Sequence, residues 1–345
     1  MRACASNFEL AQPGRRAGLL AGLGLLGLGH LAGTNLWAQG LAAGAAPAAS
    51  VAGPAAPLWV VQSERNAAQD EALRVLRSGA ALPVQAGLWS DWAQWEQLAL
   101  GSGLMLLGAR ALAAWAQRQP SALPAMPWVA GLLSQSAWAG LPEALRSRTH
   151  AAWLDQPLPR LAELLRLALP DRSRVAVLFG PATRTWREPL QDALRARRWH
   201  VHAAQLHESD GPAELFAALS RVLDGSEALL LLPDAQVVQP SQFQNLLIAA
   251  YRQRLPVVSF SQAHVRAGAT LGLYTTPAQA ALQMLDLLRL ARQPGARLQQ
   301  QWASQFELDI NEPVARSLNL QLPSVAMLAG ALMQRTSAAP EGGAR

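Results

Sequence analysis

Residues 228–277 carry the pattern that most restricts the fold of this chain. Two apolar runs, residues 228–232 and 255–260, flank an amphipathic run at residues 241–254. A strand that is apolar on both faces, followed by a helix and a second such strand, is typical of a parallel sheet covered by helices. Each apolar run ends in a short polar loop. Because ligands of open parallel sheets bind at the carboxyl ends of the strands, these loops are the first place to look for a site.

The same alternation of strands and helices extends from residue 58 to near the end of the chain. At 345 residues, of which 51% are hydrophobic, the chain is long enough for two packed cores. We therefore predict an α/β protein with two doubly wound parallel-sheet lobes and a ligand cleft between them. The predicted parts are an amino-terminal lobe at residues 58–155, a carboxyl-terminal lobe at 156–297, a hinge-crossing segment at 298–336 and a disordered tail at 337–345.

The amino terminus has the features of a secretory signal peptide. Two arginines precede an apolar, glycine-rich run at residues 17–33, and small residues allow cleavage after Ala38. We predict a signal peptide at residues 1–38, a flexible linker rich in alanine, glycine and proline at 39–57, and a periplasmic mature protein. An uncleaved membrane anchor is the alternative, but the apolar run is short for one and contains a histidine.

Charge and motif content exclude several classes of function. The net charge of +6 is dispersed along the chain, whereas nucleic-acid binders gather basic residues on one face, so we expect no nucleic-acid partner. The nucleophile-elbow, phosphate-loop and paired-carboxylate patterns of enzymes do not occur, and we expect neither enzymatic activity nor a cofactor. His200, His202 and His207 lie close together in the sequence, but we expect a solvent-facing edge strand there and no metal site.

In the first lobe, the best candidate site lies where a predicted strand, residues 104–107, runs into a helix. Gly108, Ala109 and Arg110 open that helix, and its free backbone N–H groups and positive dipole end favour an anion. The alternative is that Gly108 only provides the turn between strand and helix. The sequence leaves both interpretations open.

Further candidates follow the other predicted strands of the first lobe. Ser63 follows the first strand, and Ser134 and Gln135 follow the fourth, so all three should face the cleft. Trp89 follows the second strand, where a large flat side chain could form the wall of an aromatic pocket. Two more tryptophans follow Trp89 at a spacing of three, and packing of a helix against the sheet is the alternative explanation for all of them.

In the second lobe, Asp234 is the one carboxylate at a predicted strand end. It could pair with a ligand ammonium in a desolvated cleft. It could equally form a turn after Pro233, and the sequence favours neither interpretation. The remaining candidates follow the neighbouring strands: Pro181, Ala182 and Thr183 after residue 179, and Ser261 and Gln262 after residue 260.

Several blocks in the second half of the chain carry a family resemblance. They are LLLLPD, AAYRQRLPVVSFS, HVRAGA and LYTTPAQ. They resemble the second lobe of the periplasmic solute-binding proteins of ABC transporters, in the branch that includes bacterial tryptophan-binding proteins. The resemblance covers residues 150–324 and is weaker over 58–148. It implies the type I periplasmic-binding fold, a ligand carboxylate at the helix that begins after Gly108, and a role for Asp155 in orienting the hinge backbone.

The resemblance also implies a function. The chain is expected to be the exported solute-binding component of an ABC uptake system, which captures a small molecule by hinge closure of two lobes. The branch implies an amino acid or another small carboxylate, aromatic ones included. The expected partner is an inner-membrane ABC permease, and the protein is expected to be a monomer.

Two other functions are compatible with such lobes. A periplasmic sensor or adaptor would use the same closing fold to pass ligand occupancy to a signalling partner. A transcriptional repressor would need a helix-turn-helix at the amino terminus, where the predicted signal peptide lies instead.

Overall fold

The computed structural model describes residues 56–91, 101–118 and 126–337. The predicted signal peptide, most of the linker, the tryptophans at 92 and 95, and nearly all of the predicted tail lie outside the described residues.

The first lobe is built on a parallel sheet with the strand order β11-β5-β4-β3-β1-β2. Its strands are β1 (Leu58–Gln62), β2 (Val84–Leu88), β3 (Gly103–Leu107), β4 (Trp128–Leu133), β5 (Thr149–Trp153) and β11 (Gln300–Gln301). Four helices connect them: α1 (Ala67–Gly79), α2 (Ala109–Arg118), α3 (Gln135–Ala139) and α4 (Glu143–Arg146). Each face of the sheet buries its own hydrophobic cluster, and five tryptophans belong to one of them: Trp59, Trp115, Trp128, Trp138 and Trp153.

The second lobe repeats this plan with the order β12-β10-β9-β8-β6-β7. Its strands are β6 (Arg174–Phe179), β7 (His200–Gln205), β8 (Ala228–Leu230), β9 (Val257–Ser259), β10 (Leu271–Tyr274) and β12 (Glu307–Ile310), of which only β12 is antiparallel to its neighbour. Its helices are α5 (Leu158–Ala168), α6 (Arg187–Arg195), α7 (Pro212–Leu223), α8 (Phe243–Arg252), α9 (Gln262–Ala267), α11 (Glu312–Ser317) and α12 (Val325–Ser337), with the 3-10 turn η2 (Arg184–Trp186) before α6.

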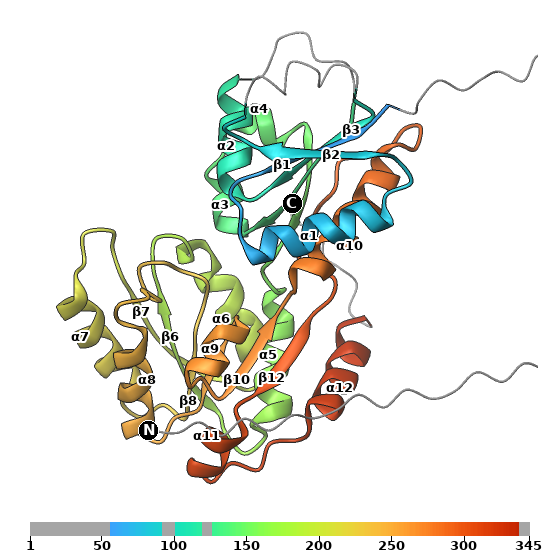
Figure 1. Ribbon diagram of the computed structural model, residues 1–345. Helices are drawn as coiled ribbons and strands as arrows, with labels where there is room; N and C mark the ends of the chain where they lie inside the picture. The colour runs from blue at the N-terminus through green and yellow to red at the C-terminus, as the bar shows by residue number, and fades with distance from the viewer. Residues whose placement is uncertain (1–55, 92–100, 119–125, 338–345) are drawn as a thin grey trace, which may run out of the picture. The chain divides into compact units, whose positions relative to one another are not determined.

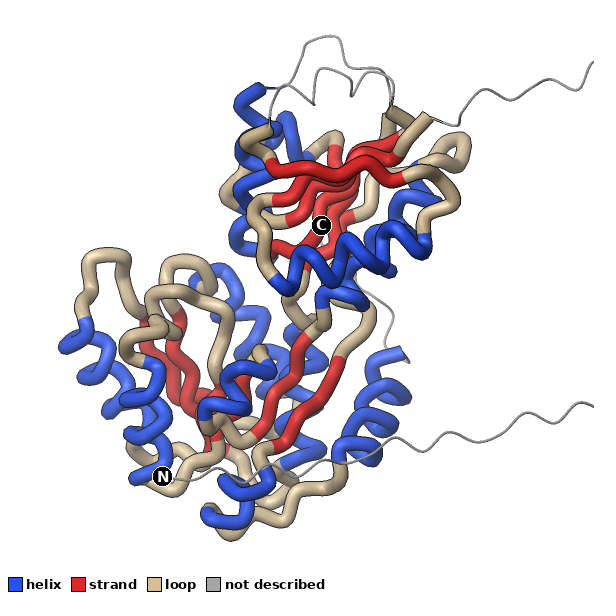
Figure 2. The backbone as a smooth tube through the Cα atoms, in the orientation of Figure 1, coloured by secondary structure: helices blue, strands red, loops and turns tan. Residues whose placement is uncertain are grey.

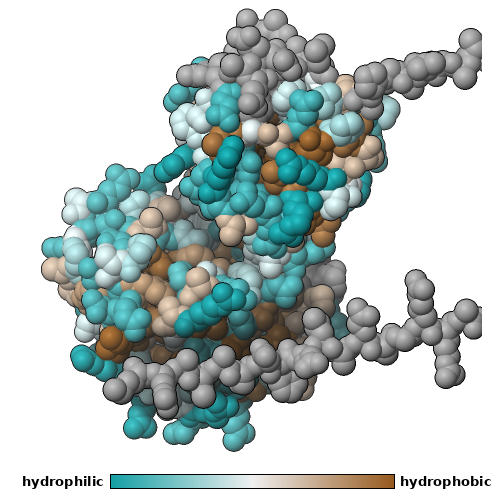
Figure 3. All heavy atoms as spheres, viewed as in Figure 1, coloured by the Kyte–Doolittle hydropathy of each residue, from teal (hydrophilic) through white to brown (hydrophobic). Residues whose placement is uncertain are grey.

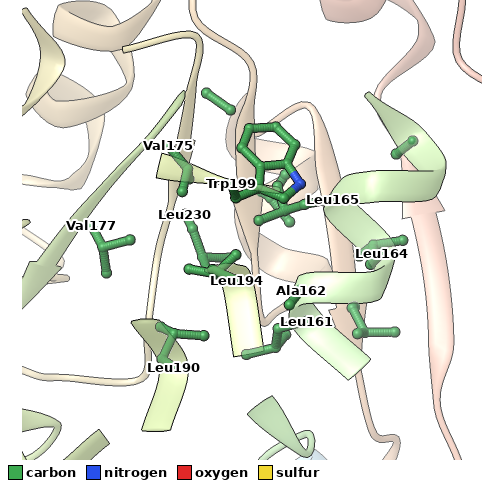
Figure 4. Packing of buried hydrophobic residues seen from close by; sticks show 14 of the residues in the cluster. Leu161, Ala162, Leu164, Leu165, Val175, Val177, Leu190, Leu194, Trp199 and Leu230 are labelled. Carbon is green, nitrogen blue, oxygen red and sulfur yellow. The ribbon is translucent and has the colours of Figure 1, made fainter. Parts of the chain in front are cut away.

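Helices flank the strands of both sheets (Figures 1 and 2). In the second lobe, leucines of α5 and α6 pack around Trp199 and against β6 and β8 (Figure 4). Burial of these strands on both faces explains their continuous apolar runs. The predicted fold class, two α/β lobes with mostly parallel sheets, is confirmed.

The helix α10 (Pro277–Ala291) follows a strand of the second sheet but packs against the first. It begins with a capping box in which Thr276 and Gln279 bind each other's backbone N–H groups. Its buried side chains, among them Met284 and Leu288, lie in one cluster with Leu58 and Val60 of β1. The predicted boundaries placed this helix in the second lobe, because an amphipathic pattern does not specify which sheet the helix covers.

The chain passes between the two sheets three times, at residues 154–157, 275–276 and 302–306. Hydrogen bonds connect all three crossovers. Gln156 Nε2 in the first donates to Thr275 Oγ1 in the second, at 2.6 Å, and Thr275 Oγ1 donates to the carbonyl of Gln305 in the third, at 2.9 Å. Polar residues of these segments, such as Gln156 and Thr275, provide hydrogen bonds where the backbone lies outside both sheets.

Figure 3 shows polar and apolar residues interspersed over the face in view. The large apolar side chains that are exposed are spread over several helices, for example Ile248 and Tyr251 on α8, Leu282 and Leu290 on α10, and Met327 and Met333 on α12. In the described part of the chain, no helix combines the length and the apolar character that crossing a membrane requires.

The packing of α10 on the first sheet predicts the effect of truncating Met284, which is fully buried against Gly131 of β4. Met284→Ala should lower the free energy of unfolding by about 2–5 kcal/mol, because it removes buried methylene groups and leaves a cavity. Leu282→Ala, on the same helix but 43% exposed, is the control and should change it by no more than about 0.5 kcal/mol. Urea denaturation measures both, and equal effects would contradict the placement of α10.

Candidate functional site

The described candidate residues all lie just beyond the carboxyl ends of strands. In the first lobe Ser63 follows β1, Trp89 follows β2, Gly108 follows β3 and Ser134 follows β4. In the second lobe Pro181 to Thr183 follow β6, Asp234 follows β8, and Ser261 and Gln262 follow β9. This is the edge at which open parallel sheets bind their ligands.

The amino terminus of α2 has two backbone N–H groups that donate to none of the residues that the structure describes. Ser63 Oγ accepts from the N–H of Ala111 at 2.9 Å and donates to the carbonyl of Leu107 at 2.7 Å, so Ser63 caps the helix and joins two strand ends. Gly108 has φ +85°, and a Cβ there would lie 2.7 Å from Ser63 Oγ. The N–H groups of Ala109 and Arg110 have no acceptor within the described residues. Both residues are exposed, so this helix end can accept a carboxylate.

Ser134 and Gln135 form the second group in the first lobe. Ser134 Oγ caps α3 by accepting from the N–H of Ala137 at 3.1 Å. The backbone N–H of Gln135 donates to Asp155 Oδ2, and its Oε1 accepts from Trp186 Nε1 of the second lobe at 3.0 Å. Leu132, two residues before Ser134, has φ +54° at an irregularity in β4. This left-handed conformation is costly for a bulky side chain such as leucine.

Three tryptophans missed in the sequence analysis meet beside Gln135. The ring of Trp302, in the third crossover, lies 5.3 Å from Trp153 and 5.5 Å from Trp186, both in edge-to-face geometry. Trp153 Nε1 is buried and has no hydrogen-bond partner among the described residues. These residues lie 33 or more positions apart in the chain and share no local pattern, so only the fold brings them together. Trp153 and Trp186 are buried and Trp302 is partly buried, so the three rings form an apolar, edge-to-face packed cluster at the crossovers.

Asp234 is 2% exposed and already has internal partners. Its Oδ2 accepts from the backbone N–H of Thr183 at 2.9 Å and from Thr183 Oγ1 at 3.0 Å, and its Oδ1 accepts from the N–H of Gln236 at 3.0 Å. Thr183 Oγ1 also accepts from the N–H of Gly180 at 3.1 Å. A Cβ on Gly180 would lie 2.2 Å from Asp234 Oδ1. Of the two interpretations of Asp234, its contacts are those of a residue that organises loops.

The loop after β9 contains a serine–histidine pair. Ser259 Oγ lies 2.6 Å from His264 Nδ1, and the imidazole packs against Phe243 and Phe260. Burial lowers the pKa of His264, so its ring is neutral at pH 7. Ser259 is only 2% exposed, which keeps its hydroxyl from acting as a nucleophile toward a solute. Ser261 caps α9 through the N–H of Ala263 at 3.2 Å.

The other candidates are more accessible. Trp89 is 38% exposed, and its backbone N–H donates to the carbonyl of Gln62 at 2.9 Å, which leaves the indole at the sheet edge. Pro181, Ala182 and Gln262 are half-buried. Among the residues that the structure describes, no three histidine, cysteine or acidic side chains are placed to hold a metal ion. β7, with His200 and His202, is an edge strand.

Comparisons with solved structures identify the fold. A conserved domain protein from Vibrio cholerae matches with a TM-score of 0.53 at 18% identity, covering 80% of this chain and 98% of that one. An ABC domain in complex with L-tryptophan from Streptococcus pneumoniae matches with a TM-score of 0.54 at 14% identity, covering 80% and 98%. A ligand-free, open substrate-binding protein with adhesive properties from Clostridium difficile matches with a TM-score of 0.58 at 14% identity, covering 78% and 96%. No protein-family model and no curated protein matches the chain. The chain has the type I periplasmic-binding fold.

The contacts of Asp234 predict that its substitution affects stability without any ligand. Asp234→Asn places an amide among three N–H and O–H donors, and should lower the free energy of unfolding by about 1–3 kcal/mol. Gly180→Ala, which displaces the same carboxylate without changing its charge, should have a similar effect. Urea denaturation of the free protein measures both. Wild-type stability in Asp234→Asn together with lost ligand binding would contradict this role.

Asp155 in the first crossover predicts a pH dependence of stability. Burial raises its pKa from 3.8 to about 6, against the opposing effect of the N–H groups of Gln135 and Asp155 itself. The folded state therefore holds this proton more tightly, and the resulting stability, present below pH 3.8, is lost as the pH rises through about 6. Relative to Asp155→Asn, the wild type should lose about 2 kcal/mol between pH 4 and pH 7.

Urea denaturation at several pH values measures this difference. Asp286→Asn, at a side chain that is 65% exposed, is the control and should follow the wild type across the range. A difference between wild type and Asp155→Asn that does not change with pH would contradict the raised pKa.

Proposed function

We propose that this chain is the exported solute-binding component of an ABC-type uptake system and captures a small molecule by hinge closure of its two lobes. The observation that carries the proposal is the pair of parallel sheets joined by three hydrogen-bonded crossovers, with candidate residues of both lobes at the carboxyl ends of the strands. Similarity in fold to a ligand-free, open substrate-binding protein supports it.

The proposed ligand is an amino acid or another small carboxylate, with aromatic compounds among the candidates. The backbone N–H groups of Ala109 and Arg110 support a carboxylate, since both residues are exposed and these groups, at the positive end of a helix, have no acceptor among the described residues. The exposed Trp89 supports a flat ligand, because its indole lies at the carboxyl end of β2. A protein of similar fold is in complex with L-tryptophan. Because Asp234 is engaged internally, we do not assign it to a ligand ammonium.

The proposed setting is the periplasm, with the protein a monomer that delivers its solute to an inner-membrane permease. The signal peptide predicted at the amino terminus supports export. The alternative predicted from the sequence, a periplasmic sensor or adaptor, uses the same closure and differs only in its partner. Binding of the closed protein to a permease, measured with the partner in detergent, separates the two.

A ligand screen followed by one backbone substitution tests the proposal. Amino acids and small carboxylates are screened by thermal shift, since a ligand at a hundred times its Kd stabilises by about 2.7 kcal/mol. Ala109→Pro removes one proposed carboxylate donor, and proline is tolerated at the first position of a helix. It should weaken a carboxylate hit about tenfold or more in calorimetry, the loss expected for a hydrogen bond to a charged group.

Ala67→Pro is the matched control, since it makes the same change at the first position of α1, where Asn66 already caps the helix. It should leave the affinity unchanged. Equal losses in both variants would contradict the carboxylate site, and a folded protein that binds no member of the panel would contradict the proposed ligand class.

A further inference from the structure

The second lobe has an arginine-rich hollow at the edge of its sheet opposite the candidate site. The hollow is lined by Glu163, Arg166, Ala196, Arg197 and Arg198. Residues 196–198 lie between the end of α6 and the start of β7, and therefore at the amino ends of the strands. Nothing in the proposed capture of a solute uses this surface.

A buried carboxylate organises the hollow. Glu163 is 5% exposed, and its Oε1 accepts from Arg166 at 2.6 Å and from Arg335 of α12 at 3.3 Å, while its Oε2 accepts from Arg197 at 2.8 Å. Burial alone would raise the pKa of Glu163, but the hydrogen bonds and charges of Arg166 and Arg197 lower it overall. The carboxylate is therefore ionised and holds the guanidinium groups in fixed positions.

The hollow has more positive charge than Glu163 can neutralise. Among the described residues, the only carboxylate that lines the hollow, that of Glu163, is accompanied by four arginines: Arg166, Arg197, Arg198 and Arg335. Arg197 Nε donates a hydrogen bond to Glu163, and one terminal nitrogen of Arg197 donates to the carbonyl of Ala193 at 3.1 Å. Its other terminal nitrogen, and the whole guanidinium of Arg198, make no hydrogen bond or ion pair with the described residues. Two adjacent arginines thus present unused donors to one hollow.

The backbone of Arg198 is a second unusual feature. Its φ is +65°, and Trp199 N–H donates to the carbonyl of Leu194, as in a helix that ends in a left-handed residue. Glycine normally occupies that position, and another residue there costs about 1–2 kcal/mol. Arg254 has the same conformation, so the strain does not by itself assign a role to Arg198, but it makes Arg198→Gly a substitution that relieves strain.

We propose that this hollow binds a phosphate group, either as inorganic phosphate or as the phosphate of an anionic lipid headgroup. Arg197 and Arg198 supply the donors, Arg166 adds positive charge, and Glu163 pre-orients Arg166 and Arg197. An anionic phosphate suits the surplus of positive charge, because each planar guanidinium can donate two parallel hydrogen bonds to phosphate oxygens. The site is independent of the solute proposed for the other edge of the sheet.

The chain offers a matched pair of variants for the test. Arg254 also has a positive φ, of +56°, and Leu255 N–H donates to the carbonyl of Ala250, so it ends α8 in the same way but far from Glu163 in the sequence. Arg198→Gly and Arg254→Gly therefore remove the same charge from the same backbone conformation, and each relieves the same strain. Both variants should fold at least as well as the wild type, which urea denaturation verifies.

The probes are inorganic phosphate, compared with chloride at constant ionic strength, and vesicles of phosphatidylglycerol or of phosphatidylcholine. The wild type and Arg254→Gly should bind phosphate in calorimetry, and Arg198→Gly should bind about tenfold more weakly or not at all. Arg198→Gln, which keeps a side chain in the strained conformation, should behave as Arg198→Gly does.

The vesicles distinguish the two sources of the phosphate. Binding of free phosphate without cosedimentation on phosphatidylglycerol would support a soluble anion. Cosedimentation that requires phosphatidylglycerol and Arg198 would support a lipid headgroup. Absence of both, or an equal loss in Arg198→Gly and Arg254→Gly, would overturn the proposal.

Discussion

The guanidinium of Arg160 joins two of the three crossovers between the lobes, and the arrangement of these crossovers depends on its hydrogen bonds. It is 9% exposed and donates to Gln156 Oε1 at 2.7 Å and to the carbonyl of Ala303 at 2.8 Å. It also lies over the ring of Phe306. A charge buried in this way is tolerated only when hydrogen bonds replace its water. Through Gln156 and Thr275 the same network reaches the remaining crossover, so the three segments form one unit.

The polar side chains at the two ends of the strands differ in what they bind. At the carboxyl ends of the strands, the polar side chains of Ser63, Ser134, Thr183 and Asp234 are engaged in capping helices and bracing loops. In the function proposed above, recognition of a solute would therefore rest on backbone N–H groups and on the exposed ring of Trp89. The opposite edge of the second sheet carries the surplus charge around Glu163.

Much of the fold could be predicted because its signals are local. The apolar runs that become β1, β3 and β6 are continuous, as strands covered on both faces require. The pairing of α10 with the first sheet could not be predicted, since it depends on contacts with β1, more than 200 residues earlier in the chain. For the same reason the sequence analysis missed Trp153, Trp186 and Trp302 as a cluster.

The sequence by itself determined the fold class and the strand ends at which candidate residues lie, because periodicity and burial are properties of short segments. Only the tertiary structure decided what those residues do. Asp234 and Ser63 have the chemistry of ligand partners, but in the fold they already accept hydrogen bonds from the N–H groups of Thr183 and Ala111. A polar group forms hydrogen bonds with the partners that the fold brings within about 3 Å. For Asp234 and Ser63 these partners are distant in the sequence, so local patterns do not reveal them.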